Sequence, residues 1–392
     1  MTCERPSCDS TPSQPPSPQI GAMIAKAVKA ALADQPTDAG LTVLINDPQR
    51  HTNSRAVLLE ICRHVDPVTI RILVATGTHC IAASRRCKFQ AALVGELPIS
   101  HLAWHDCRDA ALVAIGSQWR GHPWLLGPPP VVAIGSVEPH YFAGFTGAHK
   151  TCTIGCASHA DIEANHAAAL DDSSQPARLS GNGVYEGILR MLRALQGAQR
   201  VSAINLVQSG GQIVSATSGE PIDALTGLVP TAEKMFIRRI DAAVDALVLE
   251  VTGPLGRSFY QADKGIKNNE HAVRDGGCIV LVAGCEDGLG QDNFVSLLRE
   301  AQTYEQAMDA VAGRGYRLGD HKATRLRKLT DPAQRAVRAF LVSDGLSADE
   351  ARLLGMSKSA SVEGALLSAG VDAARDRVLR VGDAGNACVL RR

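Results

Sequence analysis

A mostly apolar segment, Leu41-Thr-Val-Leu-Ile-Asn46, leads directly into a polar one, Asp47-Pro-Gln-Arg50. This pair of segments is the clearest indication of the fold, because it joins a predicted strand to a polar loop. A short apolar run that ends in such a loop is typical of a strand buried inside a parallel sheet. Apolar residues recur at helical spacing over 20–34, and Asn53 or Ser54 can cap a helix after the loop. The stretch therefore predicts alternating helices and strands.

The same order of strand and polar loop recurs along the first half of the chain. Strands are predicted over 70–75, 99–104 and 131–135, and a histidine follows each of them in the next loop. In parallel sheets, ligands bind beyond the carboxyl ends of the strands. We therefore expect these loops to meet at one edge of a sheet, although they lie far apart in the sequence.

The second half of the chain continues this alternation after a pair of strands predicted over 201–217. We expect an α/β fold with two α/β domains, over 20–240 and 241–392, with largely parallel sheets and an active-site cleft between them. Residues 1–19 are rich in proline and serine and are predicted to be a disordered tail. In the second domain we predict strands over 245–251, 278–283 and 339–343, and helices over 260–275, 294–300 and 348–354.

The composition is that of a globular protein without an overall charge. Lys and Arg together number 40, as do Asp and Glu, so no net field favours nucleic acid or an anionic membrane surface. The sequence shows no secretory signal over 1–19 and no apolar run of a length that could span a membrane. The 11 cysteines are scattered through apolar segments, which favours free and mostly buried thiols. We expect a cytoplasmic protein that binds neither nucleic acid nor membrane.

The densest polar stretch is Glu138-Pro-His-Tyr-Phe-Ala-Gly-Phe-Thr-Gly-Ala-His-Lys-Thr-Cys-Thr-Ile-Gly155. Gly144 and Gly147 precede Lys150 in it, and glycines let a loop approach a ligand closely enough for its amides to cradle a phosphate. The spacing differs from the GxxxxGK[ST] pattern, so no nucleotide-hydrolysing activity follows. The alternative for this loop is a simple turn.

Three histidines are candidates for chemistry. His79 and His140 each follow a predicted strand, where loops carry binding and catalytic groups, and imidazole suits acid/base work near neutral pH. His166 lies in a predicted helix, and the alternative for it is a packed or surface histidine. HExxH and GxSxG motifs are absent, as is GxGxxG after the first strand, which disfavours a zinc protease, a serine hydrolase and a standard Rossmann dehydrogenase.

Two further segments offer polar groups for an anionic substrate. Tyr260 opens a predicted helix, on which Gln261 and Lys264 lie three positions apart and can hold a carboxylate together. Arg50 offers a bidentate fork for a carboxylate or a phosphate. The alternatives are a solvated helix face and a surface arginine. These segments favour a small substrate that bears a carboxylate.

Taken together, the segments resemble the lactate racemase family, whose enzymes use a nickel-pincer nucleotide. Each motif is short, but Lys150 follows His140 by ten positions and His166 follows Lys150 by sixteen, and this shared order makes the set specific. The resemblance covers nearly the whole chain after the tail. The matching segments are Asp47-x-x-Arg50, Thr76-Gly-x-His79, Glu138-Pro-His-Tyr-Phe-Ala-Gly144, Gly147-x-x-Lys150, Asn165-His166, Tyr260-Gln-x-x-Lys264, Gly276–Val282 and Asp287-Gly-Leu-Gly290.

The resemblance implies a cofactor in the first domain, a nickel(II) complex of a pyridinium bisthiocarboxylate mononucleotide. It implies that Lys150 can be tethered to this cofactor, that His166 is a nickel ligand, and that cofactor-synthesis proteins are partners. The resemblance also implies cofactor contacts for Asp47, Pro48, Gln49 and Arg50. It implies substrate contacts for Arg50, Tyr260, Gln261 and Lys264.

The activity that the resemblance implies is racemisation or epimerisation of a 2-hydroxy acid by proton-coupled hydride transfer. One of His79 and His140 removes the hydroxyl proton while hydride leaves the neighbouring carbon for the cofactor. Hydride then returns to the other face of the 2-keto acid, and the second histidine returns the proton. An enzyme that inverts a carbon needs a base on each side, which explains two histidines.

The chain departs from the family in three places. The strands with which the family usually begins are replaced by the tail, so we expect a smaller N-terminal sheet. The segment Thr151–Gly155 lacks the proline that commonly precedes its glycine. Many lactate-acting members place a tryptophan near the substrate, where this chain has His321. His321 is therefore a predicted substrate-binding residue, and it favours a substrate with a polar or second acidic side chain.

Two other functions remain open from the sequence. One is a protein that binds or handles the cofactor without racemising anything. The other is a zinc- or iron-dependent hydro-lyase or dehydrogenase that uses the same histidines. A hydro-lyase or dehydrogenase of this kind gives Lys150 and its glycine-rich loop no role, so we favour the racemase.

Overall fold

The computed structural model describes residues 17–392 except 34, 51 and 373. Most of the predicted tail, 1–16, therefore lies outside the described residues. Helix α1 (Pro18–Leu32) begins two residues before the predicted helical segment. The Ser17 side chain accepts a hydrogen bond from the Ile20 amide, and proline suits the first turn of a helix.

Six strands form the first sheet, in the order β10-β9-β6-β1-β2-β3. All neighbours from β9 to β3 run parallel, and β10 pairs antiparallel with β9. β1 and β2 pair along their whole length, from Leu41 opposite Ile70 to Asn46 opposite Ala75. The bounds are β1 (Leu41–Asn46), β2 (Ile70–Ala75), β3 (His101–Trp104), β6 (Val131–Ser136), β9 (Val201–Ser209) and β10 (Gln212–Gly219).

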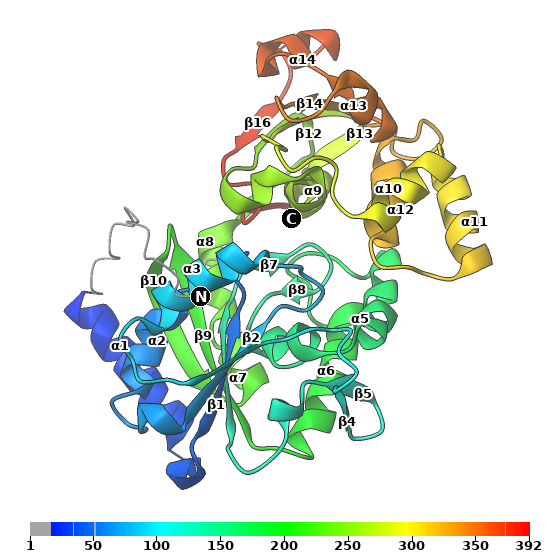
Figure 1. The fold of residues 1–392 in the computed structure, drawn as a ribbon. Helices are drawn as coiled ribbons and strands as arrows, with labels where there is room; N and C mark the ends of the chain where they lie inside the picture. The colour runs from blue at the N-terminus through cyan, green and yellow to red at the C-terminus, as the bar shows by residue number, and fades with distance from the viewer. Residues whose placement is uncertain (1–16, 34, 51, 373) are drawn as a thin grey trace.

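Helices cover both faces of this sheet (Figure 1). Val43 of β1 packs in the apolar cluster that contains α1 and α2, whereas Leu44 packs in the cluster that contains α5 and α6. Burial on both faces is what the apolar run of β1 predicts. The helices are α2 (Ser54–Ile61), α3 (Ala83–Val94), α4 (Ala148–Thr151), α5 (His159–His166), α6 (Gly183–Gln196), α7 (Pro221–Thr226) and α8 (Val229–Phe236).

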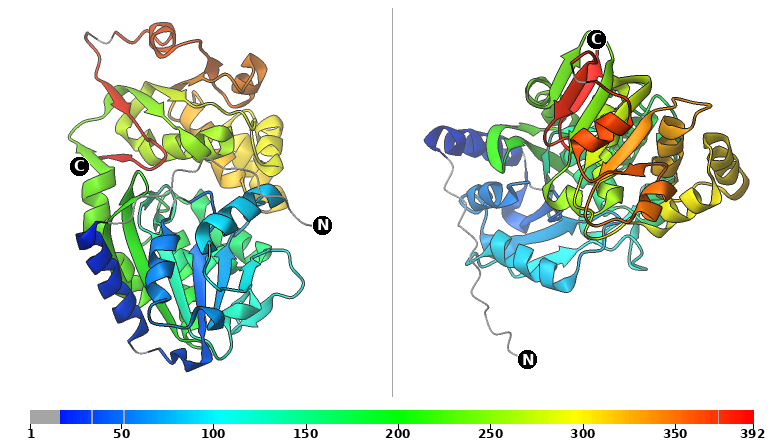
Figure 2. Two further views of the ribbon diagram at one scale, coloured as in Figure 1. Left: turned by 60° about the vertical axis from the view of Figure 1, so that its left-hand side comes forward. Right: turned by 90° about the horizontal axis from the view of Figure 1, so that it is seen from above.

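Five parallel strands form the second sheet, in the order β15-β14-β13-β12-β16. Figure 2 shows this second unit stacked against one end of the first. The strands are β12 (Val244–Glu250), β13 (Val273–Val282), β14 (Arg338–Val342), β15 (Ser357–Lys358) and β16 (Val378–Val381). The helices are α9 (Phe259–Asn269), α10 (Asp292–Glu300), α11 (Tyr304–Arg314), α12 (Asp320–Thr330), α13 (Ala348–Leu353) and α14 (Val362–Ser368).

Three pairs of short strands complete the described part of the chain. The pair β11 and β17 runs parallel, whereas the other two pairs are antiparallel. The bounds are β4 (Val113–Ile115), β5 (Trp119–Gly121), β7 (Pro139–His140), β8 (Gly144–Phe145), β11 (Ile237–Ile240) and β17 (Cys388–Arg391).

The predicted helix over 260–275 is too long. Helix α9 ends at Asn269, and residues 273–275 belong to β13. The buried Asn269 side chain explains the end of the helix, because its Nδ2 donates to the carbonyls of Gly265 and Ala384, and its Oδ1 accepts from the amide of Val389. These contacts tie the end of α9 to the C-terminal segment, which lies far away in the sequence.

The predicted fold class, two α/β units with largely parallel sheets, is confirmed. The domain boundary near residue 240 stays a prediction. All nine cysteines in the described part of the chain are free, and six of them are buried. None of the described helices has the length and apolar character that a membrane crossing needs.

Candidate active site

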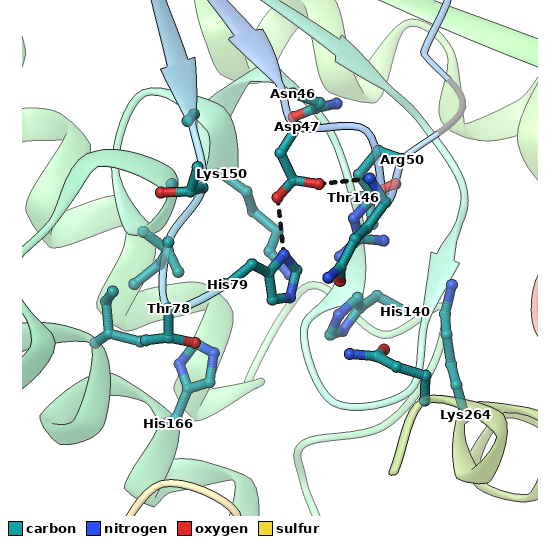
Figure 3. Close-up of a pocket in the computed structure, with 18 of the residues that line it drawn as sticks. Asn46, Asp47, Arg50, Thr78, His79, His140, Thr146, Lys150, His166 and Lys264 are labelled. Carbon is teal, nitrogen blue, oxygen red and sulfur yellow. Dashed lines mark hydrogen bonds and ion pairs between the residues drawn. The ribbon is translucent and has the colours of Figure 1, made fainter. Parts of the chain in front are cut away.

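A cavity lies where the carboxyl ends of β1, β2 and β6 face the second unit. Figure 3 shows polar side chains from several loops pointing into it. Pro48 is the one predicted site residue that does not line the cavity. Those that do are Asp47, Gln49, Arg50, His79, His140, Lys150, His166, Tyr260, Gln261, Lys264 and His321.

His79 is oriented by a buried carboxylate. Asp47, which is 2% exposed, accepts a hydrogen bond at 2.8 Å from Nδ1 of His79 through one oxygen. Its other oxygen accepts from the Gln49 amide at 2.7 Å, so the carboxylate is itself fixed (Figure 3). Because Nδ1 carries the hydrogen, the lone pair of the neutral ring lies on Nε2. The pair has the geometry of a carboxylate that orients a general base.

His140 has a different environment. Its Nδ1 accepts a hydrogen bond from the Ala143 amide at 3.3 Å, so the neutral ring carries its hydrogen on Nε2. The ring stacks on Tyr141, with centroids 5.0 Å apart, and meets the Phe142 ring edge-on at 4.5 Å. Burial, and then the positive charge of Lys150 and other cations, lowers the pKa of His140 well below its usual value. His140 is therefore neutral at physiological pH.

Lys150 lies in the short helix α4, which packs directly on β6. A Cβ at Gly135 of β6 would lie 2.3 Å from the Ala148 amide nitrogen, so glycine is required there. The Lys150 amine has no hydrogen-bond or ion-pair partner in the described structure, and its Nζ lies 5.6 Å from the centre of the Phe142 ring. Burial, followed by the charges of Arg50 and Lys264, lowers the pKa of Lys150 well below its usual value. A neutral amine is a nucleophile.

His166 ends helix α5 and presents one ring nitrogen to the cavity side. Its Nδ1 lies 3.2 Å from Oδ1 of Asn165, whose Nδ2 donates to the Val184 carbonyl at 3.0 Å. An amide oxygen only accepts, so Nδ1 carries the hydrogen and Nε2 keeps its lone pair. Burial, and then Lys150, lowers the pKa of His166 to about 3. A neutral imidazole with a fixed tautomer is the form that binds a metal ion.

The cavity carries an excess of positive charge. Arg50, Lys150, Lys264 and Lys322 line it, and among its described lining residues Asp47 is the one acidic side chain. Burial and then Arg50 lower the pKa of Lys264 to about 8, so this amine is still largely protonated at neutral pH. Among the described residues, neither Arg50 nor Lys264 forms an ion pair, although Glu138 and Asp383 raise the pKa of Lys264 from a distance. The arrangement therefore favours an anionic ligand.

Both ring nitrogens of His321 already have hydrogen-bonding partners. Its Nε2 lies 3.2 Å from the Tyr141 hydroxyl and its Nδ1 lies 2.7 Å from the Tyr316 hydroxyl. His321 is 1% exposed, and it lines the cavity as part of this chain of three side chains. A second polar group of a substrate has no vacant nitrogen to bind here. His321, which was predicted to bind the substrate, therefore has no free hydrogen-bond donor or acceptor on its ring.

Many lining residues were not among the predicted site residues, and Tyr141, Phe142 and Lys322 are three of them. Tyr141 and Phe142 lie within the polar stretch around His140, and their position beside a candidate histidine was the available signal. Lys322 follows His321 and lies 3.6 Å from the buried Asp263. No local sequence motif indicates that Lys322 belongs to the site, because its ion-pair partner, Asp263, lies on a different helix.

No group of three or more His, Cys, Asp and Glu side chains that could hold a metal ion occurs among the described residues. Cys152 and Cys156 are buried and form no disulfide.

Comparisons with known proteins agree with the two-unit architecture. A family model described as the lactate racemase N-terminal domain matches residues 10–177, and one described as the lactate racemase C-terminal domain matches residues 241–388. The lactate racemase of Thermoanaerobacterium thermosaccharolyticum is 28% identical over 293 residues, 70% of this chain and 67% of that protein. The lactate racemase of Lactiplantibacillus plantarum is 29% identical over 271 residues, 64% of this chain and 61% of that protein.

Two solved structures share the fold. The lactate racemase apoprotein of T. thermosaccharolyticum superposes with a TM-score of 0.81 at 23% identity, over 93% of this chain and 92% of that chain. A Thermotoga maritima protein superposes with a TM-score of 0.75 at 14% identity, over 95% of this chain and 98% of that chain. At these identities the likeness concerns the fold alone.

Proposed function

The chain belongs to the lactate racemase family and is therefore an isomerase, and we propose that it inverts the hydroxyl-bearing carbon of a small 2-hydroxy acid. One observation carries the proposal: two imidazoles, His79 and His140, reach a cavity that is rich in cations. A carboxylate substrate needs the cations, and inversion needs a proton acceptor on each side of the carbon.

We propose a nickel-pincer nucleotide as the cofactor, and the donor groups of the cavity support this choice. Lys150 offers an unpaired amine of lowered pKa, which can form the covalent tether. His166 offers an Nε2 lone pair, and imidazole suits nickel. With no cluster of protein ligands in the described residues, a metal at His166 draws its other ligands from the nucleotide. When held by Lys150 and His166, such a cofactor would supply the hydride acceptor and donor for the substrate carbon.

In the proposed mechanism, His79 takes the hydroxyl proton of one enantiomer at Nε2. Asp47 keeps the hydrogen on Nδ1 and stabilises the positive charge that the ring gains. This is a role for Asp47 that the sequence resemblance did not imply. His140 serves the other face, and to accept a proton at Nε2 its neutral ring has to carry its hydrogen on Nδ1, so this step replaces the 3.3 Å contact with the Ala143 amide by the other tautomer. The substrate carboxylate is held by Lys264 and Gln261 of α9, with Arg50 and Tyr260 beside them.

The experiment that tests the proposal is a screen of enantiopure 2-hydroxy acids with nickel-loaded holoprotein. The panel contains lactate, longer aliphatic, aromatic, malate-like and sugar acids, and chiral chromatography follows the appearance of the opposite configuration at the hydroxyl-bearing carbon. We expect at least one acid to be interconverted. No interconversion of any acid by loaded protein would contradict the racemase and favour cofactor handling. Zinc or iron bound without a nucleotide would favour a hydro-lyase or dehydrogenase.

Two variants separate the acid/base pair from cofactor binding. His79→Asn and His140→Asn each lower turnover by about 10²–10⁴-fold, the usual contribution of a general acid or base. The cofactor absorbance stays unchanged in both. Each variant still forms 2-keto acid from the one enantiomer that the remaining histidine serves, which rapid quenching detects. His101→Asn, at an exposed position on β3, is the matched control with full activity.

We also propose a cytoplasmic location and proteins of cofactor synthesis as partners. The free thiols of the described chain suit a reducing compartment, and a nickel-containing nucleotide has to be made before it is loaded.

A further inference from the structure

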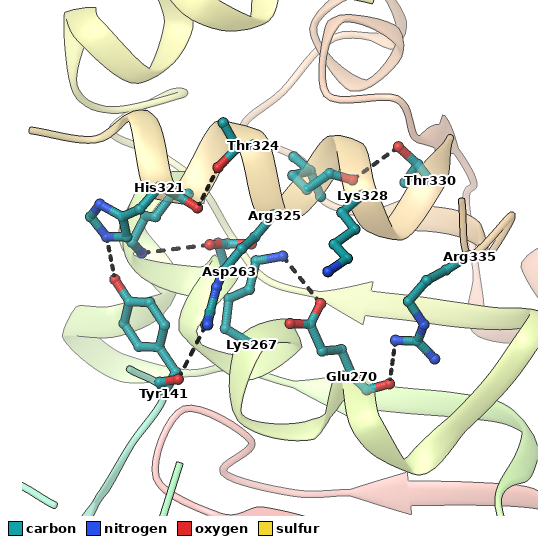
Figure 4. Close-up of polar contacts among 12 residues, drawn as sticks. Tyr141, Asp263, Lys267, Glu270, His321, Thr324, Arg325, Lys328, Thr330 and Arg335 are labelled. Atoms are coloured by element: carbon teal, nitrogen blue, oxygen red, sulfur yellow. Dashed lines mark hydrogen bonds and ion pairs between the residues drawn. The ribbon is translucent and has the colours of Figure 1, made fainter. Parts of the chain in front are cut away.

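Helix α12 of the second unit holds one residue of the first unit, Tyr141, at three points. The Tyr141 hydroxyl lies 3.2 Å from Nε2 of His321, and Nζ of Lys322 lies 5.0 Å from the centre of the Tyr141 ring. One turn further along, Arg325 donates a hydrogen bond at 3.3 Å to the Tyr141 carbonyl. Figure 4 shows the two polar contacts converging on this residue. We call His321, Lys322 and Arg325 the Tyr141 clamp.

Two of the three clamp residues, His321 and Lys322, are fixed within the second unit. Nδ1 of His321 lies 2.7 Å from the Tyr316 hydroxyl. Lys322 donates to the carbonyl of Tyr260, lies 3.6 Å from the Asp263 carboxylate, and has its Nζ 4.3 Å from the centre of the Tyr260 ring. These contacts restrict the rotamers of both clamp residues before they meet Tyr141. The position of the second unit therefore determines the position of Tyr141, because these side chains do not rearrange to fit it.

On its other side, Tyr141 supports His140. The two rings are stacked, with centroids 5.0 Å apart and planes 19° apart. The structure gives His140 a single polar contact among the described residues, the 3.3 Å hydrogen bond from Ala143. One long hydrogen bond leaves the ring free to rotate about it, so packing against Tyr141 and Phe142 decides the plane of the imidazole.

We propose that Tyr141 is a positioning residue through which helix α12 sets the orientation of His140. This inference rests on the proposed function, because it assigns a consequence to the orientation of one of the two proposed acid/base residues. Proton transfer depends steeply on geometry, and a displacement of about 1 Å can cost about 10²-fold in rate. Seating of the second unit against the first then completes the acid/base pair.

The test uses holoenzyme of Tyr141→Phe, which removes the hydroxyl and keeps the stacked ring. We expect kcat to fall by about 10-fold while KM changes by less than about 2-fold, because proton transfer is misaligned and the carboxylate contacts remain. The solvent deuterium isotope effect on kcat rises, since proton transfer limits the rate more strongly. The cofactor absorbance is unchanged.

A double-mutant cycle and a matched control make the test specific. His321→Phe lowers kcat like Tyr141→Phe, and the double variant is no slower than the slower single variant, because both remove one contact. Tyr304→Phe removes the hydroxyl of a second-unit tyrosine whose described contacts, an amide hydrogen bond to Asp331 and a ring contact with Lys328, involve neither Tyr141 nor the clamp, and its kcat stays within about 2-fold of wild type. Additive losses, an effect confined to KM, or equal losses in Tyr141→Phe and Tyr304→Phe would overturn the proposal.

A readout without turnover separates this inference from the proposed function. In protein labelled with ¹⁵N-histidine, Tyr141→Phe shifts the ring resonances of His140 and leaves those of His79 in place. If wild-type holoprotein racemises no acid but this shift appears, the proposed function fails and the positioning role stands. Unchanged His140 resonances would overturn the positioning role whatever the activity.

Discussion

The buried amine of Lys150 suits the proposed chemistry but destabilises the folded protein. Burial and neighbouring cations lower the pKa of its amine, so the folded protein holds this proton less tightly than the unfolded chain does. The destabilisation is fully present below the folded pKa and disappears as pH rises to the unfolded value of about 10.4. We therefore expect Lys150→Met to raise the melting temperature of cofactor-free protein by at least about 2 °C at pH 7.

Calorimetry over a range of pH checks this expectation. The gain should shrink as pH approaches 10, where the amine of the unfolded chain also loses its proton. Lys150→Arg, which keeps a charge at all these pH values, is the control and should lower the melting temperature. A melting temperature of Lys150→Met that equals wild type at every pH would show that the amine is not held in an unfavourable environment.

Single residues also show what the sequence could and could not reveal about the site. His79, His140 and Lys150 were placed as candidates because they follow strands or glycine-rich loops, whereas His166 lies in a predicted helix and its role came from the family resemblance. All four line one cavity. The pairing of Asp47 with His79 was not predicted, since 32 positions separate them and only the meeting of β1 and β2 joins them. Local spacing carries no information about such a contact.

At the scale of elements, strands buried on both faces were predicted best. β1 and β2 match their predicted ranges because a mostly apolar run between polar loops has few alternatives. Helix α9 was predicted six residues too long, because Asn269 ends it through contacts with the C-terminal segment. Helix α12 was not predicted at all, since its buried residues mix the apolar Ala323, Leu326 and Leu329 with Asp, His, Lys, Thr and Arg, which obscures the apolar spacing.

The Asn269 contacts lead to a prediction about the end of α9. Asn269→Ala leaves the Val389 amide and the Gly265 and Ala384 carbonyls without this partner, all of them buried or close to the core. We expect a loss on the order of 3 kcal/mol in the free energy of unfolding, measured by denaturant titration. Amide hydrogens of β17 should exchange faster.

Asn386→Ala is the matched control, because the Asn386 side chain bonds only to Asp383 near the surface. Its unfolding free energy should stay within about 0.5 kcal/mol of wild type. Equal losses in the two variants would mean that Asn269 does not tie α9 to the C-terminal segment.

At the scale of the whole molecule, the apolar cores of the two units are largely separate. Leu318 of the second unit packs into a core of the first, and Leu170 of the first packs against a core of the second. Polar ties join them as well, including the Leu318 amide to Glu163 and the exposed ion pair of Lys328 with Asp172. Exposed ion pairs of this kind stabilise little, about 0–1 kcal/mol. The cavity between the units is therefore where a ligand can strengthen the junction.

Because Arg50 and Lys264 line the cavity from opposite units, we propose that the anionic substrate contacts both. At 100 times its Kd a ligand stabilises the form that binds it by about 2.7 kcal/mol, and only the assembled pair of units offers the complete site. In hydrogen exchange of holoprotein with saturating substrate, we therefore expect slower exchange in β1 and in α9 together. Lys264→Ala is the discriminating variant, because it removes the contact from the second unit while Arg50 remains. Substrate should then protect β1 alone, and protection of α9 that survives this change would mean that the two units are coupled through their packing rather than through the ligand.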